Sequence, residues 1–323
     1  MFTTAATLFL KRIAAAFSSD KQKKSKFLMV IGSLVVGLIL LFLMPIAVYQ
    51  SFGYMESPDV DVHFDEAAFL SQLTPEQQTE ISAVEADGQA IADAMAAAGL
   101  REQTIKAQLI YMSYFKDSRI SDFAGYAGHF YQDNYQLIQS LNYDYSLDID
   151  YNEFKNTYLF VMNSTINEYM FTDRYTKNSA DLAAWCRNAV TSGWGFDDYC
   201  IGERTGENNL RCTSNIGLIT GYLRYNADSR SFTDDVICLY YTEQGSIDTM
   251  PNAQGVGVFN GDDFGVYIGG GQVVFSSAIG GCVQQQALEY GNWTSWCTFD
   301  AVRYPQEVWD RVNELHREEN EGE

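Results

Sequence analysis

The chain has few histidines and few basic residues. Its 323 residues include three His, 21 Lys and Arg, and 42 Asp and Glu, which give a formal net charge of −21. Because proteins that neutralise nucleic-acid phosphates need a basic face, this balance excludes that class of protein. Hydrophobic residues make up 46% of the chain and aromatic residues 14%, which excludes a wholly disordered protein. We therefore expect one or two folded domains beyond any targeting segment.

The histidines are also unevenly distributed. They are His63, His129 and His316, so none lies between Tyr131 and Leu315. Imidazole is the side chain that most readily serves as a general base or metal ligand near neutral pH. Its scarcity limits catalysis by His and His-rich metal sites, and we expect the protein to bind no metal and no other cofactor.

One uncharged segment is long enough to cross a membrane. Residues 27–49 (FLMVIGSLVVGLILLFLMPIAVY) would form a helix about 35 Å long, against a hydrocarbon core of roughly 30 Å. Six basic residues and one acidic residue precede it. The positive-inside rule therefore predicts a single-pass protein of the cell membrane, with residues 1–26 as a basic cytoplasmic tail and residues 50–323 extracytoplasmic. A cleaved signal peptide is the alternative, but the apolar segment is too long and no clear A-x-A site follows it.

The extracytoplasmic part is strongly acidic. It retains 15 basic and 41 acidic residues, a net charge of −26. Such a surface attracts cations or basic partners, although solubility in a crowded cell envelope is the simpler interpretation. The first predicted partner is the lipid bilayer, through residues 27–49, and no nucleic-acid partner is expected.

All six cysteines lie in the last part of the chain. In an oxidising compartment an even number of cysteines indicates disulfides, here three. Short loops favour Cys200–Cys212 and Cys282–Cys297, which leaves Cys186 with Cys238, although the sequence cannot choose among the connectivities. A zinc site is not expected, because no CxxC pair and no neighbouring His are present.

The extracytoplasmic part divides into a helical half and a mixed half. Residues 50–73 are predicted to be a stalk, and a capping box with Pro75 at the first helical position begins a helix. Helices are expected over 74–98, 101–115, 133–141 and 151–169. They form a Tyr-rich module over 74–176, in which the tyrosines pack in a core or form an aromatic docking surface.

Residues 142–153 have the spacing of an EF-hand calcium loop. However, Asn142 replaces the Asp of the first position, and Leu147 occupies the sharp turn that requires Gly. We therefore expect a turn that caps the next helix rather than a calcium site.

Residues 177–304 are predicted to form an α+β domain with an antiparallel sheet. Asn178 can cap a helix over 180–190, and residues 215–223 (NIGLITGYL) indicate a short apolar helix. Strands are expected over 237–241, 256–259, 264–268, 272–275, 283–288 and 293–299, with Gly-rich and Asp-rich turns between several of them. Residues 305–323 are expected to form an acidic terminal helix.

The order of two of these segments resembles a known family. The segment at 214–225 (SNIGLITGYLRY) followed by that at 255–277 (GVGVFNGDDFGVYIGGGQVVFSS) resembles the NlpC/P60 family of papain-like cysteine peptidases. The resemblance extends over about 74–304 and is greatest to membrane-anchored versions carried by conjugative elements of Gram-positive bacteria. It implies an NlpC/P60-like domain over 177–304.

The resemblance also implies where catalytic residues would lie. In the family a Cys opens the helix, a His begins the strand after it, and a third polar residue on the next strand orients the His. These positions fall on Asn215, Phe264 and Phe275, so all three depart from the family pattern. The nearest thiol that could act instead is Cys212, which we expect in a disulfide.

Three functions follow from these observations. The first is a catalytically inactive protein that binds in the cell envelope, with peptidoglycan or envelope and conjugation proteins as partners. The second is an active peptidoglycan cysteine endopeptidase that uses Cys212, and the third is a surface adhesin or assembly subunit. Trp293 and Trp296 are expected to pack in the core or at its rim, with a glycan-stacking platform as their functional alternative.

Overall fold

The structure is a computed structural model that describes residues 75–115, 120–162, 166, 170–205, 210–234 and 239–321. The predicted cytoplasmic tail, membrane helix and stalk lie outside these residues, as do Cys238 and the start of the strand expected over 237–241. Of the described part of that strand, 239 and 240 are irregular and only Tyr241 belongs to a strand, which runs on to Ser246. Within the described ranges, no helix combines the length and apolar character needed to span a bilayer. The membrane helix at 27–49 therefore stays a prediction.

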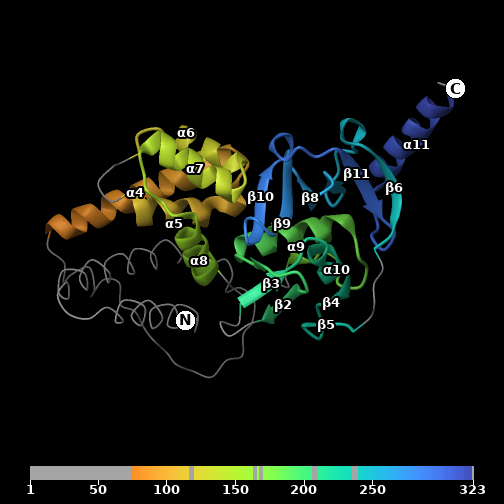
Figure 1. Ribbon diagram of the computed structural model, residues 1–323, viewed down its shortest axis with the longest axis horizontal. Coiled ribbons are helices and arrows are strands. Elements are labelled where there is room, and N and C mark those ends of the chain that lie inside the picture. Colours follow the sequence, from red (N-terminus) through yellow and green to blue (C-terminus); the bar gives the residue numbers. More distant parts are fainter. Residues whose placement is uncertain are drawn as a thin grey trace. The chain divides into compact units, whose positions relative to one another are not determined.

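The described chain has an α+β fold, as the sequence predicts, and it forms two compact units. The first unit contains α4 (Pro75–Ala97) and α5 (Thr104–Tyr114), and the second contains the remaining described elements (Figure 1). Helices α4 and α5 pack together through buried residues that include Ile91, Met95 and Ile110. They match the helices expected over 74–98 and 101–115, except that a 3-10 turn, η1 (Arg101–Gln103), precedes α5.

Three further helices belong to the second unit. They are α6 (Phe123–Gly128), α7 (Asn134–Tyr145) and α8 (Tyr151–Met162), and a 3-10 turn, η2 (His129–Tyr131), separates α6 from α7. The backbone N–H of Asn134 donates to Gln284 Oε1 at 2.9 Å, and the Tyr151 hydroxyl donates to the Gly280 carbonyl at 2.7 Å. These bonds join α7 and α8 to the sheet, so the boundary predicted at residue 176 is not the boundary between the two units.

The segment with EF-hand spacing is the turn between α7 and α8. The carboxamide of Asn142 accepts from the backbone N–H of Ile149 and donates to its carbonyl, and Asp150 accepts from the backbone N–H of Glu153. The side chains at two of the calcium-ligand positions are thus engaged with the backbone, in the capping role that the sequence predicts.

A nine-stranded sheet forms the centre of the second unit, with strand order β2-β3-β1-β10-β9-β8-β7-β11-β6 (Figure 1). Its strands are β1 (Gly195–Phe196), β2 (Ile201–Thr205), β3 (Leu210–Thr213), β6 (Tyr241–Ser246), β7 (Gly257–Phe259), β8 (Phe264–Gly269), β9 (Gln272–Ser277), β10 (Cys282–Ala287) and β11 (Ser295–Phe299). The predicted antiparallel meander is confirmed in β7 to β10. The whole sheet is mixed, however, because β1 and β3 are parallel.

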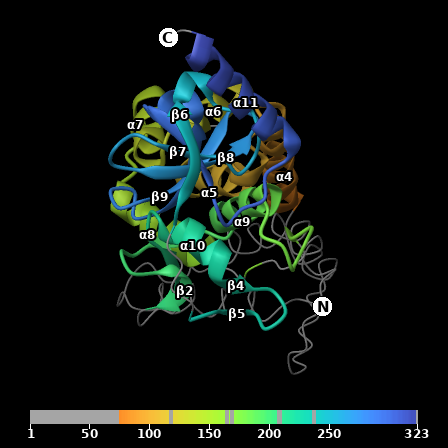
Figure 2. The ribbon, with the colours of Figure 1, turned by 90° about the vertical axis from the view of Figure 1, so that its right-hand side faces the viewer.

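Two helices cover the sheet on the core side. Helix α9 (Ser179–Thr191) packs against β8, β9 and β10, and α10 (Gly217–Arg224) packs against α9 and β2 (Figure 2). Asn178 caps α9 by accepting from the backbone N–H of Asp181, as its sequence predicts. A two-stranded ribbon, β4 (Tyr225–Asn226) and β5 (Ser231–Phe232), follows α10.

The glycines of the GLITGYL segment allow α10 to approach β2 closely. A Cβ atom at Gly221 would lie 1.8 Å from the Ile201 carbonyl oxygen, and one at Gly217 would lie 2.1 Å from that of Cys200. Only a residue without a side chain fits at such a distance from the backbone of another element. The two glycines in the segment that carries the family resemblance are thus also required for the packing of α10 in this fold.

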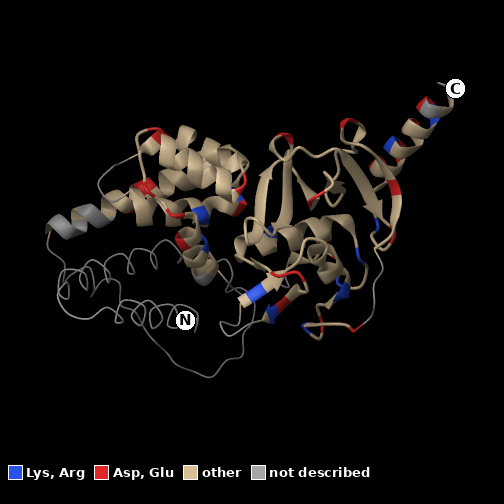
Figure 3. Cartoon of the chain, in the orientation of Figure 1, with Lys and Arg blue, Asp and Glu red and all other residues tan. Residues whose placement is uncertain are grey.

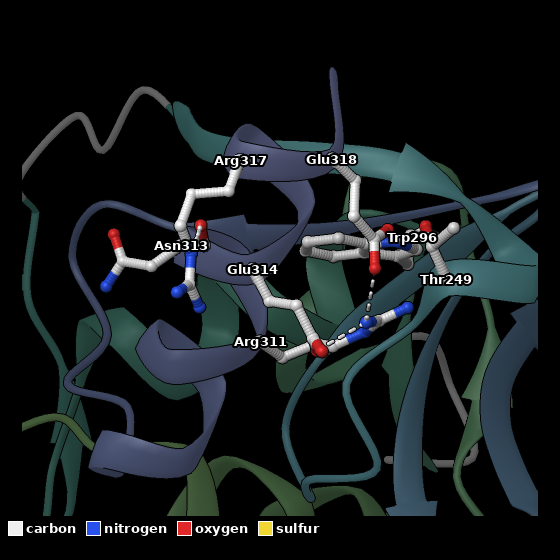
Figure 4. Close-up of polar contacts among 7 residues, drawn as sticks. All are labelled: Thr249, Trp296, Arg311, Asn313, Glu314, Arg317 and Glu318. Atoms are coloured by element: carbon white, nitrogen blue, oxygen red, sulfur yellow. Dashed lines mark hydrogen bonds and ion pairs between the residues drawn. The ribbon is translucent and has the colours of Figure 1, made fainter. Parts of the chain in front are cut away.

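The chain's last described element is α11 (Gln306–Glu321), which corresponds to the predicted terminal helix. Val308 and Val312 are buried on its inner face. On its outer face Arg311 forms ion pairs with Glu314 and Glu318 (Figure 4). This division into an apolar and a charged face is typical of a helix that covers a core from one side.

Candidate functional site

The structure brings the start of α10 to the start of β8. The Asn215 carboxamide donates from Nδ2 to Asp263 Oδ1 at 3.1 Å, and its Oδ1 accepts from the backbone N–H of Phe264 at 2.8 Å. Phe275 lies on the neighbouring strand β9, where it pairs with Gly265. The three positions that the resemblance assigns to catalysis are therefore gathered in one place.

The side chains at these positions carry no nucleophile and no base. Phe264 is buried and stacks on Phe259, with the ring centroids 5.9 Å apart. Phe275 is also buried and meets the Trp293 ring edge-on at 5.6 Å. A carboxamide and two aromatic rings pack and form hydrogen bonds, but they cannot supply covalent or acid–base catalysis.

Cys212, the thiol proposed as a substitute nucleophile, has a different environment. It lies on β3, and its Sγ donates weakly to the Leu210 carbonyl at 3.6 Å. Burial raises the pKa of this thiol. A reactive cysteine needs the opposite shift, because the thiolate is the nucleophile.

The two cysteine pairs predicted from loop length differ in whether the structure brings their thiols together. Five cysteines are described, and none of these is joined in a disulfide. The pair Cys282–Cys297 is wrong, because β10 and β11 are four strand positions apart in the sheet, about 19 Å at the usual strand spacing. A short loop in the sequence does not bring the two together, since β11 returns to the far side of β7.

Cys200 and Cys212 do lie near each other. The Sγ of Cys200 is 3.7 Å from the Thr205 hydroxyl, and the Cys212 thiol also interacts with that hydroxyl. Burial raises the pKa of Cys200 to about 11. Cys186 is fully buried in α9, and its predicted partner Cys238 lies outside the described residues.

Both tryptophans of the GNWTSWC segment are buried. Trp296 is 1% exposed and donates from Nε1 to the Thr249 hydroxyl at 3.0 Å (Figure 4). Trp293 is 5% exposed, and its Nε1 has no hydrogen-bond partner in the described part of the chain. Both therefore pack in the core, which is the structural role predicted for them, and neither offers an open ring face to a sugar.

A groove of about 320 Å³ lies beside the gathered positions, and we call it the α7–β10 groove. It is bounded by the start of α7, the β7–β8 turn, one face of β9 and β10, and the turn before β11. Its lining residues include Asp133, Tyr135, Asp263, Phe275, Gln286 and Tyr290, and no Lys or Arg. Volumes of this size lie at the lower end of the range for ligand pockets.

Two aspartates face this groove with one oxygen engaged each. Asp133 Oδ1 caps α7 by accepting from the backbone N–H groups of Tyr135 and Gln136, and Asp263 Oδ1 accepts from Asn215. Burial raises the pKa of the Asp263 carboxyl, and the charges of Asp262 and Asp133 act in the same direction. The groove thus holds negative charge that the described residues do not neutralise.

The groove is not among the features predicted from the sequence, although β10 contains a signal for it. Its sequence CVQQQA places three successive Gln in a strand that is buried along its whole length. Because side chains alternate along a strand, Gln284 and Gln286 share the groove face and Gln285 points to the other. Buried carboxamides are uncommon and need partners, so such a run marks a polar surface inside the fold.

The two described histidines have structural partners. His129 Nδ1 is 2.9 Å from the Ser140 hydroxyl, and its Nε2 is 3.5 Å from Asp144. His316 joins α11 to β6 through Glu243 at 3.2 Å. Among the residues that the structure describes, no cluster of His, Cys, Asp and Glu has the arrangement of a metal site.

No family model, no curated protein and no solved structure matches the chain.

Proposed function

We propose that the protein is a membrane-anchored, extracytoplasmic protein with an NlpC/P60-like domain that has no catalytic activity and acts by binding in the cell envelope. The observation that carries the proposal is the meeting of Asn215, Phe264 and Phe275. A carboxamide and two packed rings stand where a peptidase of this kind needs a thiolate, an imidazole and a polar residue that orients it.

The α7–β10 groove supports a binding role. It lies beside these positions, since Asp263 and Phe275 belong to its lining. Peptidoglycan, or envelope proteins of a conjugative transfer apparatus, are the partners that the resemblance suggests. The bilayer is reached through residues 27–49, with the amino terminus in the cytoplasm.

The proposal is tested with the full-length protein in detergent, by peptidoglycan zymography and analysis of the released muropeptides. We expect no hydrolysis, and the Cys212→Ser variant should behave as the wild type does. Muropeptide release that disappears after thiol alkylation and in Cys212→Ser would overturn the proposal and establish the endopeptidase instead.

A second candidate, an assembly or adhesion subunit, has one observation in its favour. Tyr143 is 87% exposed and Tyr135 is 48% exposed, and both lie on α7. Exposed tyrosines are enriched at protein interfaces. Loss of envelope-protein binding in Tyr143→Ser, with unchanged binding in the control Tyr175→Ser, would favour this candidate.

A further inference from the structure

The α7–β10 groove contains a polar side chain that the fold leaves without a partner. Gln286 is 5% exposed and lines the groove, and its carboxamide makes no hydrogen bond to another described residue. A carboxamide that lines a groove and makes no bond within the described fold can both donate to and accept from a ligand there.

The charges around Gln286 select the kind of ligand. Asp133 and Asp263 each keep one carboxylate oxygen that accepts no hydrogen bond from the described residues, and no basic side chain lines the groove. Strands β9 and β10 contain no Lys or Arg, whereas β2 and β3 each contain an Arg (Figure 3). A cationic ligand would therefore meet uncompensated negative charge.

The remaining walls distinguish between cations. Tyr135 and Tyr290 are 48% and 47% exposed at the groove, and the Phe275 ring forms part of its floor. A planar guanidinium stacks on aromatic rings and presents five N–H donors to carboxylate and carboxamide oxygens. An ammonium can also bind an aromatic face, but it is a point charge with three donors and lacks the planar fork that matches a carboxylate and stacks on a ring. The volume of about 320 Å³ suits one long side chain better than a cofactor.

We propose that the α7–β10 groove binds an arginine side chain presented by a partner protein, with its guanidinium between Asp133 and Asp263 and within reach of the Gln286 carboxamide. The net charge of −26 on residues 50–323 favours the approach of such a basic partner. This inference rests on the proposed function, because it assigns the groove beside the replaced catalytic positions to recognition.

The experiment uses the full-length protein in detergent and the blocked peptide acetyl-Gly-Arg-Gly-amide, with binding followed by saturation-transfer NMR of the peptide. The matched control peptide replaces Arg by citrulline, which keeps the shape and removes the charge. We expect the citrulline peptide and the corresponding Lys peptide to bind at least tenfold more weakly than the Arg peptide. Equal binding of the Arg and citrulline peptides, or of the Arg and Lys peptides, would overturn the inference.

Variants locate the binding. Asp263→Asn and Gln286→Leu should each weaken binding of the Arg peptide at least tenfold. Asp262→Asn removes one charge from the same turn but does not line the groove, and it should weaken binding less than threefold. Thermal melting of each variant verifies that it is folded. Equal losses of affinity in Asp262→Asn and Asp263→Asn would show that net charge alone attracts the peptide, and would refute binding in the groove.

The two proposals fail separately. Hydrolysis of peptidoglycan by the same preparation would end the non-catalytic function whatever the peptide does. Absence of hydrolysis together with absence of Arg-peptide binding would end only the present inference.

Discussion

Asn215 and Asp263 are joined side chain to side chain, 3.1 Å apart, where the helix and the strand that would carry a peptidase's nucleophile and base begin. The same carboxamide accepts from the backbone N–H of Phe264. One side chain thus performs the structural task of holding α10 to β8.

The two hydrogen bonds of the Asn215 side chain should stabilise the fold. Asn215→Ala removes both bonds and leaves the Phe264 N–H without its partner, so the free energy of unfolding should fall by about 2 kcal/mol. Asn215→Asp keeps an acceptor for Phe264 but places a second carboxylate against Asp263. It should be destabilising at neutral pH and recover near pH 4, as measured by denaturant unfolding. A pH-independent loss in Asn215→Asp would contradict the assigned geometry.

Asp263 should reduce stability at neutral pH. Its pKa is raised in the folded protein, so the carboxyl binds its proton more tightly there than in the unfolded chain. The tighter proton binding contributes stability to the folded state. That stability is fully present below the unfolded pKa and is lost as pH rises through the folded pKa. Asp263→Asn should therefore raise the Tm at pH 7 relative to wild type and have little effect at pH 3. A lower Tm at pH 7 would show that the charge stabilises the fold.

The two buried tryptophans provide a matched comparison. Trp293→Phe removes an N–H that has no partner among the described residues, whereas Trp296→Phe removes one that donates to Thr249. Both substitutions lose a similar buried volume. We expect Trp296→Phe to cost about 1 kcal/mol more in the free energy of unfolding, since it also leaves the Thr249 hydroxyl without this bond. Equal costs would indicate that neither hydrogen-bonding environment affects stability.

Gly221 should tolerate no side chain. A Cβ atom there would meet the Ile201 carbonyl oxygen, and backbone cannot move aside as a side chain does, so Gly221→Ala should cost about 3 kcal/mol. The control is Gly128→Ala at the end of α6, where nothing lies within 4 Å of the added atom. That change should be neutral or stabilising by up to about 1 kcal/mol. Urea unfolding of the two variants compares them directly.

Oxidation should join Cys200 to Cys212 and never Cys282 to Cys297. The first two thiols both approach Thr205, while the other two lie on β10 and β11, four strand positions apart. A Cys200–Cys212 bond closes a short loop and should stabilise the oxidised protein by about 3 kcal/mol. Peptide mapping under non-reducing conditions identifies the pair, and a Cys282–Cys297 peptide would contradict the sheet order.

Local features of the sequence predict most of the described helices and the strands β7 to β11, but not β1 to β5. The Pro75 capping box, the Asn178 cap and the turns between 256 and 275 each act within a few residues, and the structure has an element at each of them. The approach of α10 to β8 was predicted only through the family resemblance.

Features that depend on distant pairing were not predictable. The parallel pairing of β1 with β3, and the return of β11 to the far side of β7, depend on which strands find each other in space. For this reason Cys282 and Cys297 are close in the sequence but lie on strands that are far apart in the sheet. The α7–β10 groove is likewise assembled from α7, the β7–β8 turn and β10, which lie more than 100 residues apart in the chain at their extremes.

The position of β11 sets a late step in the synthesis of this protein. Because β11 lies between β7 and β6, β6 joins the sheet only through residues 295–299, near the carboxyl end. A chain that emerges amino end first therefore holds β6 as an unpaired strand until residues 295–299 are available. Until then that strand is open to pairing with other chains, so this region is where we expect chaperones or proteases to act first on the unfinished chain.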